Sequence, residues 1–216
     1  MLVLALDAST YVGSVALIGD GEVLAQATAA MRGEREERLM PAISELLSAH
    51  SVTLDRLTAV ACGAGPGSFT SLRIAASIAK GLCAARRVPL LVAPSTLLVL
   101  AAAEQDLETG AYVVAMDAMR GDFFWQDVVV DGELRPGMCG RSSRVELEHH
   151  ASARGARIVG PSESPPMAPH ARGFARLIAS GIAAEVEMTT WEPTYGRKAE
   201  AQVKWEAAHG RELGAS

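Results

Sequence analysis

The sequence from Gly63 to Ser68 reads Gly-Ala-Gly-Pro-Gly-Ser and lies between an apolar run typical of a strand and a segment with helical periodicity. Glycines allow a ligand to approach the backbone, and the free amides at a helix N-terminus attract anions. Gly65, Gly67 and Ser68 are therefore candidate contacts for a phosphate or a nucleotide. The turn lacks the Gly-Lys-Ser/Thr of a Walker A motif and the glycine spacing of a dinucleotide site. A tight turn with Ser68 as the helix N-cap is the favoured interpretation.

A second polar group follows the first predicted strand. Asp7 ends an apolar run, and Ser9 and Thr10 follow it within a short turn. Ligands of open α/β folds bind beyond the carboxyl ends of strands, so these side chains could contact a phosphate or orient a metal-bound water. The alternative, that they hydrogen-bond the turn backbone, is favoured for so short a motif. Asp117 ends a similar apolar run, 112–116, and is expected at the equivalent position of a second lobe.

The histidines and cysteines follow no pattern expected of a metal site or a nucleophile. None of the five histidines falls in an HxxxH or HExxH motif, and no serine lies in GxSxG. The three cysteines are odd in number and widely spaced, which argues against a disulfide framework and indicates a reducing compartment. Metalloprotease and acyl-hydrolase functions are therefore disfavoured, and we expect no metal site.

The composition indicates a folded protein that does not bind nucleic acid by itself. Of 216 residues, 49% are hydrophobic and 21% charged, and the formal net charge is −5. Phosphate backbones are bound mainly by clustered lysine and arginine, so any RNA role is expected to be shared with a partner. The start, MLVLALDAST, has no basic region and reaches an aspartate at the seventh residue, so neither a signal peptide nor a membrane span is predicted. We therefore expect a cytoplasmic protein.

Alternating apolar runs and amphipathic segments predict an α/β lobe over residues 1–104. The predicted strands cover residues 2–6, 12–18, 22–29, 57–62 and 88–93. The predicted helices cover residues 39–47, 69–85 and 95–104. A polar connection, EQDLETG, follows and predicts a domain boundary.

The pattern then restarts, which predicts a duplicated fold with a smaller carboxyl-terminal lobe over residues 105–195. Its predicted strands cover residues 112–116, 123–130 and 157–159, and its predicted helices cover 141–153 and 171–179. Residues 196–216 are predicted to form a terminal helix that packs back on the first lobe.

The helix predicted over 69–85 is unusually rich in small residues. Ala75, Ala76, Ala79, Gly81 and Ala84 make it small-sided nearly all round, which predicts burial on more than one face. One face would pack on its own sheet, and the other could accept a helix from the same chain or from another subunit. We therefore expect a helical docking surface here.

Four segments in chain order resemble the bacterial TsaB (YeaZ) family: LALDAST, GAGPGSFTSLRIAASIAKGL, MDAMRGDFFW and EPTYGRKAEAQVKWE. The second is the most specific. The resemblance implies an α/β, actin-like (ASKHA, RNase H-like) fold with two lobes of mixed sheets flanked by helices. It also implies a non-catalytic partner of the paralogue TsaD, which transfers a threonylcarbamoyl group to adenosine 37, next to the anticodon, of tRNAs reading codons that begin with A.

The resemblance further implies a heterodimer with TsaD, contact with the ATPase TsaE, a homodimer when free, and tRNA binding only through the complex. It implies no cofactor of the chain's own, with ATP and Mg possible at the level of the complex, and no membrane. Members of the family dock through the first two helices, about residues 34–48 and 68–85 here. The implied interface residues are Leu39, Met40, Ile43, Thr70, Arg73, Ile74 and Ser77. Ser71 stands where the family commonly has glycine, and Arg35 where a histidine is frequent.

Two other functions are alternatives to this one. An ATP-dependent phosphotransferase or ATPase of the actin-like superfamily would use Asp7, Asp117 and the glycine turn as its site. A glycoprotein peptidase, an old label for the wider family, needs a metal-binding histidine pair that this sequence lacks.

Overall fold

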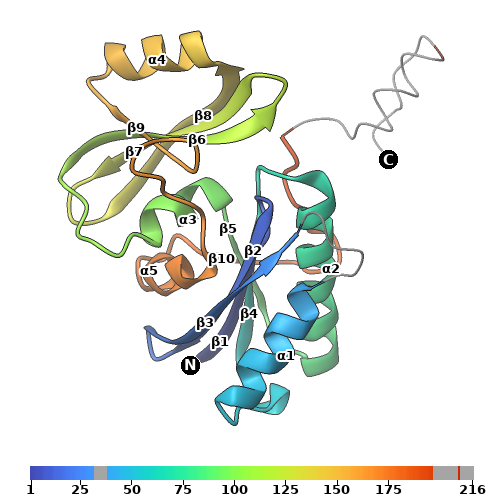
Figure 1. Cartoon of the computed structure of the whole chain (residues 1–216). Coiled ribbons are helices and arrows are strands. Elements are labelled where there is room, and N and C mark those ends of the chain that lie inside the picture. The colour runs from blue at the N-terminus through green and yellow to red at the C-terminus, as the bar shows by residue number, and fades with distance from the viewer. Residues whose placement is uncertain (32–37, 197–208, 210–216) are drawn as a thin grey trace.

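The computed structural model describes residues 1–31, 38–196 and 209. Residues 1–31 and 38–196 form two lobes, each built on one β-sheet (Figure 1). The sheet of the first lobe has the strand order β10-β5-β4-β1-β2-β3. Its strands are β1 (Leu2–Asp7), β2 (Val12–Gly19), β3 (Glu22–Ala30), β4 (Ala59–Gly63), β5 (Leu90–Ala93) and β10 (Ala184–Val186). The three central strands, β1, β4 and β5, run parallel to one another, and the others are antiparallel to their neighbours.

The continuous apolar run of β1 is explained by burial on both faces of this sheet. Successive side chains of a strand point to opposite faces, so Val3 and Ala5 face one core while Leu4 and Leu6 face another. All four are fully buried. The outer face is covered by α1 (Leu39–Ala49) and α2 (Phe69–Arg86), with a short 3₁₀ turn, η1 (Leu54–Arg56), between them in the chain (Figure 1).

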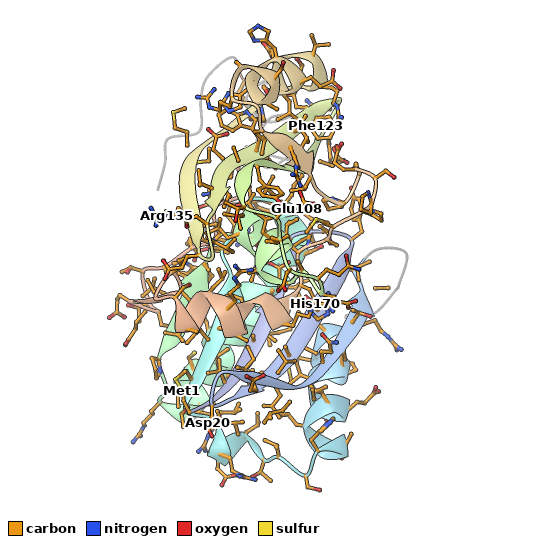
Figure 2. All side chains as sticks on the ribbon, turned by 90° about the vertical axis from the view of Figure 1, so that its left-hand side faces the viewer. Met1, Asp20, Glu108, Phe123, Arg135 and His170 are labelled. Atoms are coloured by element: carbon orange, nitrogen blue, oxygen red, sulfur yellow. The ribbon has the colours of Figure 1, made fainter. Side chains whose placement is uncertain are left out.

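The second lobe is a four-stranded sheet with the order β8-β7-β6-β9. Its strands are β6 (Gly110–Met119), β7 (Asp122–Val130), β8 (Leu134–Ser143) and β9 (Arg157–Val159). Helix α4 (Arg144–Ala153) covers its outer face, where Leu147 and Ala151 pack on Val113 and Ala115. Figure 2 shows Phe123 in this lobe, at the opposite end of the molecule from Met1 and Asp20.

The start of α4 differs from the sequence-based expectation of a helix over 141–153. Arg141 pairs with Phe124 and Ser143 with Asp122, so the residues before 144 extend strand β8. The helix begins after a capping box, in which the Ser143 side chain accepts from the Glu146 N–H and the Glu146 side chain accepts from the Ser143 N–H. Strand pairing on one side and the cap on the other therefore fix the boundary.

Three short helices fill the space between the two sheets: α3 (Ser95–Ala101), η2 (Ala171–Gly173) and α5 (Phe174–Ala179) (Figure 1). They form one apolar core with side chains from both lobes, including Val3 of β1 and Val114 of β6. Phe174 is completely buried in it. A buried hydrogen bond from the Thr96 hydroxyl to the Gln126 side-chain oxygen also joins α3 to β7. The helix predicted over 95–104 ends earlier, at Ala101. It lies between the two lobes and not within the first lobe alone.

The chain returns to the first lobe before its end. Residues 105–195 were predicted as the second lobe, but β10 pairs antiparallel with β5 and adds an edge strand to the first sheet. Residues 197–208 and 210–216 of the predicted terminal helix lie outside the described residues. Among the described helices, none is both long and apolar enough to cross a membrane.

Candidate functional site

A cleft of about 180 Å³ lies between the two lobes, where β1 and β6 end. Five of the seven residues predicted for anion or nucleotide binding line it: Ser9, Thr10, Gly67, Ser68 and Asp117. The rest of its wall is largely apolar and includes Met116, Ala118 and Phe124 from the second lobe. The other two predicted residues, Asp7 and Gly65, do not line the cleft and are buried behind it.

Asp7 uses both carboxylate oxygens within the protein. Its Oδ1 accepts from the Ser9 backbone N–H at 3.1 Å and from the Ser9 hydroxyl at 2.7 Å. Its Oδ2 accepts from the Ser95 hydroxyl at 2.6 Å, and the Ser95 oxygen accepts in turn from the Gly65 N–H at 3.0 Å. The carboxylate thus ties β1 to α3 and to the glycine turn. Asp7 and Ser9 therefore hydrogen-bond within the turn, as the alternative to a ligand-binding role predicts.

Burial raises the pKa of Asp7 above its ordinary value of 3.8, while the hydrogen bonds from Ser95 and Ser9 act in the opposite direction. The carboxyl group therefore holds its proton to higher pH in the folded protein than in the unfolded chain. Ionisation favours unfolding, so this group's contribution to the free energy of unfolding falls as pH rises from the ordinary pKa through the folded one.

Replacing Asp7 with asparagine is expected to remove the contribution of this residue to the pH dependence of the free energy of unfolding, because the amide does not ionise. Urea denaturation of both proteins between about pH 4 and about pH 7 measures the free energy of unfolding. The unaltered chain should lose stability relative to Asp7→Asn as pH rises. A gain relative to the variant over the same range would contradict the assignment.

The backbone amides of the glycine turn are largely used within the protein. The N–H groups of Ala64 and Ser68 donate to the carbonyl oxygens of Ala93 and Ser9, each at 2.8 Å, and the Gly65 N–H donates to Ser95. These three amides are therefore not available to a phosphate.

Ser68 occupies the N-cap position of α2, but its side chain makes no capping hydrogen bond. Its Oγ lies 3.0 Å from the Oγ of Ser71 instead.

Gly67 is required by close packing. A Cβ at this position would overlap the backbone of Ser9, which accepts the Ser68 N–H. The glycine thus allows the start of α2 to lie directly against the turn after β1. This contact explains the glycine without a ligand.

Asp117 repeats the local geometry of Asp7 at the end of β6. Its Oδ1 accepts from the Met119 N–H two residues on, at 2.6 Å, as Asp7 accepts from the N–H of Ser9. Unlike Asp7 it is exposed, and it faces the cleft. The described residues that line the cleft include no lysine or arginine, so a phosphate there would meet a carboxylate and no cation.

The described residues also contain no group of three or more His, Cys, Asp and Glu that could hold a metal ion.

The exposed face of α2 carries a shallow groove of about 470 Å³, here named the α2 groove. It is lined by Phe69, Thr70, Arg73, Ile74, Ser77 and Ile78. The four interface residues expected on this helix, Thr70, Arg73, Ile74 and Ser77, therefore lie together on one surface. Sequence reasoning missed Phe69 and Ile78, although their spacing of three to four residues from the others places them on the same helical face.

The opposite face of α2 packs on the first sheet through Ala75, Ala79, Leu82 and Cys83. The prediction that this small-sided helix is buried on more than one face is therefore wrong for the chain alone. Its small side chains bring one face close to the sheet, and a Cβ added at Gly81 on the other side would meet nothing.

The interface residues expected on α1 divide between surface and core. Met40 is 39% exposed, but Leu39 and Ile43 are 0% and 1% exposed and pack against the first sheet. Leu39 and Ile43 belong to the apolar face with which α1 covers its own lobe. Their assignment to a partner surface is corrected accordingly.

Known proteins resemble this chain in sequence and in structure. The TsaB proteins of Escherichia coli K12 and Haemophilus influenzae, each named "tRNA threonylcarbamoyladenosine biosynthesis protein TsaB", are 35% identical over 128 residues and 37% identical over 135 residues. These alignments cover 59% and 60% of this chain, and the chain spans about half the length of the two relatives, 54% of each.

The solved structure "YeaZ from Pseudomonas aeruginosa" is 27% identical, with a TM-score of 0.73, and the match covers 90% of this chain and 100% of that one. A second structure, of an uncharacterized protein with similarity to peptidase YeaZ from Pseudomonas aeruginosa, has a TM-score of 0.76 and the same identity. This second match covers 91% of this chain and 99% of that one.

Two lobes of mixed sheets, helices packed between them and a cleft at the strand ends define an α/β protein of the actin-like fold. The family model described as tRNA N6-adenosine threonylcarbamoyltransferase, TsaD, matches residues 23–143, more than half of the chain. The chain belongs to this family, as a member of its bacterial TsaB (YeaZ) branch, the paralogue of TsaD.

Proposed function

We propose that this chain is a non-catalytic partner subunit of TsaD, required in the cytoplasm for threonylcarbamoyl transfer to adenosine 37 of tRNAs reading codons that begin with A. The names of the curated relatives support a role in threonylcarbamoyladenosine synthesis. In this role the chain forms a heterodimer with TsaD, meets TsaE in the assembled complex, and contacts tRNA only through its partners. When free, it pairs with a second copy of itself.

The observation that carries this proposal is the α2 groove. Phe69, Ile74 and Ile78 form an apolar centre, and Thr70 and Ser77 border it with small polar groups. Aromatic and large aliphatic side chains at the centre of a polar-rimmed patch are typical of protein interfaces. A partner helix laid along α2 would cover this centre.

The interlobe cleft supports the non-catalytic part of the proposal. Both carboxylate oxygens of Asp7 accept hydrogen bonds from Ser9 and Ser95. The described residues that line the cleft include no cation that could bind a phosphate. A phosphotransferase needs positive charge around the transferred group. We therefore expect ATP and Mg to act in the assembled complex rather than in this cleft alone.

Reconstituted tRNA modification tests the proposal. TsaD, TsaC, TsaE, ATP, threonine, bicarbonate and tRNA are combined with and without this chain, and modified adenosine is measured by mass spectrometry. We expect modification only when both this chain and TsaD are present. Full activity without the chain would contradict the partner role, and substantial ATP turnover by the chain alone would favour the ATPase alternative.

A further inference from the structure

The segment that follows β10 runs beside α2 and is held at both ends by aromatic contacts. At one end the Lys80 ammonium lies 5.8 Å from the centre of the Trp191 ring and 3.1 Å from a Glu192 carboxylate oxygen. At the other end the Tyr195 ring lies on the Phe69 ring, with centres 4.4 Å apart and planes tilted by 44°. Residues 191–196 are named the strap.

The backbone of the strap packs directly on the glycine turn. The Thr194 N–H donates to the Ala64 carbonyl at 2.8 Å, and the Thr194 carbonyl occupies the space that a Cβ at Gly65 would need. A Cβ at Gly196 would overlap the ring of Phe124, a residue that also lines the interlobe cleft. The strap is therefore fixed by main-chain contacts as well as by its side chains.

Phe69 connects Tyr195 to the α2 groove, because its ring contacts the Tyr195 ring and also lines the groove. The Arg73 guanidinium lies 5.3 Å from the centre of the Phe69 ring, on the groove side. The Tyr195 hydroxyl lies 3.3 Å from Glu192, whose other oxygen is paired with Lys80. Burial raises the pKa of Tyr195, with Glu192 acting in the same direction and the nearby charge of Arg73 against it.

Arg73 gives the groove a charge that a partner can match. Within the described part of the chain it forms no ion pair, and it lies among the apolar side chains of Phe69 and Ile74. A guanidinium on an aromatic face binds a carboxylate well, because the stacking holds its donors in one direction. The chemistry fits an apolar helix that carries a carboxylate opposite Arg73.

We propose that the strap is a positioning element of the partner site, in which Tyr195 holds Phe69 and Arg73 at one end of the α2 groove to receive an apolar, carboxylate-bearing helix of TsaD. This inference rests on the proposed function, which supplies the identity of the partner. It adds Tyr195 and Trp191, which lie far from α2 in the sequence, to the residues that determine binding.

The replacement Tyr195→Ala tests the inference, with Tyr195→Phe as its matched control. Loss of the stacked ring is expected to weaken binding to purified TsaD about tenfold, whereas Tyr195→Phe keeps the ring and should stay within about twofold. In a Phe69→Ala background, Tyr195→Ala should cause little further loss, because it acts through Phe69. Isothermal titration calorimetry measures the affinities, and thermal unfolding confirms that each variant is folded.

The outcomes separate this inference from the proposed function. If the unaltered chain does not bind TsaD, the proposed function is overturned and the strap inference with it. If the unaltered chain binds and Tyr195→Ala, folded, binds equally well, the strap inference alone is overturned. Should Tyr195→Ala not fold, Trp191→Ala loosens the other anchor, and binding equal to that of the unaltered chain would overturn the inference in the same way.

Discussion

Replacing Ile74 with glutamate is expected to weaken binding to TsaD by about 100-fold or more while leaving the fold intact. Ile74 lies in the centre of the α2 groove and is only partly buried in the free chain, so the new carboxylate stays hydrated there. In the complex the partner would cover it, and an unpaired buried charge costs several kcal/mol. Calorimetric titration gives the affinity, and circular dichroism melting shows whether the variant is folded.

Val145 provides the matched control. It is 76% exposed on α4 of the second lobe, so Val145→Glu introduces the same charge far from the α2 groove and should leave binding unchanged. Ala76 is not suitable for the test, because it is only 5% exposed and a glutamate at this buried position would disrupt the fold. Undiminished binding by folded Ile74→Glu would exclude the α2 groove from the partner surface.

Replacing Gly67 with alanine is expected to destabilise the protein by about 3 kcal/mol, because the added methyl overlaps main-chain atoms that cannot rotate away. The Ser9 backbone would have to move, and with it the hydrogen bond from Ser68 at 2.8 Å. For a chain of this length, a loss of this size lowers the Tm by roughly 10 °C. Urea denaturation and thermal unfolding measure both quantities.

Gly81→Ala serves as the control for this prediction. Gly81 lies in the interior of the same helix, and its added Cβ would contact nothing. Alanine there should raise the free energy of unfolding by about 0.5–1 kcal/mol, as expected for an exposed helix position. If Gly67→Ala were as stable as the unaltered chain, close packing would not explain Gly67, and a ligand at the turn would again have to be considered.

Most of the fold could be predicted from local patterns. Apolar alternation and helical spacing identify β1 to β7, α1 and α2, and the paired aspartates Asp7 and Asp117 indicate the repeated lobe. The start of α4 and the position of β10 could not be predicted in the same way. They depend on pairing with β7 and β5, and such partners are distant in the chain.

The candidate site was predictable only where its residues share one element. Thr70, Arg73, Ile74 and Ser77 lie on one helix, so their periodicity alone places them on one face. No local pattern links Asp7 with Ser95, 88 residues away, or Phe69 with Tyr195. For Leu39 and Ile43 the same periodicity could not distinguish a face that covers its own sheet from one that meets a partner.

The return of β10 to the first sheet has a consequence for the order of synthesis. Most of the first lobe is translated early, yet the edge of β5 stays unpaired until residues 184–186 have left the ribosome. The strap at residues 191–196 is translated next, so its contact with Phe69 forms later than the pairing of β10 with β5. A nascent chain thus displays α2 well before Tyr195 arrives, and it can present the whole of this surface to another subunit only after residue 195 has been translated.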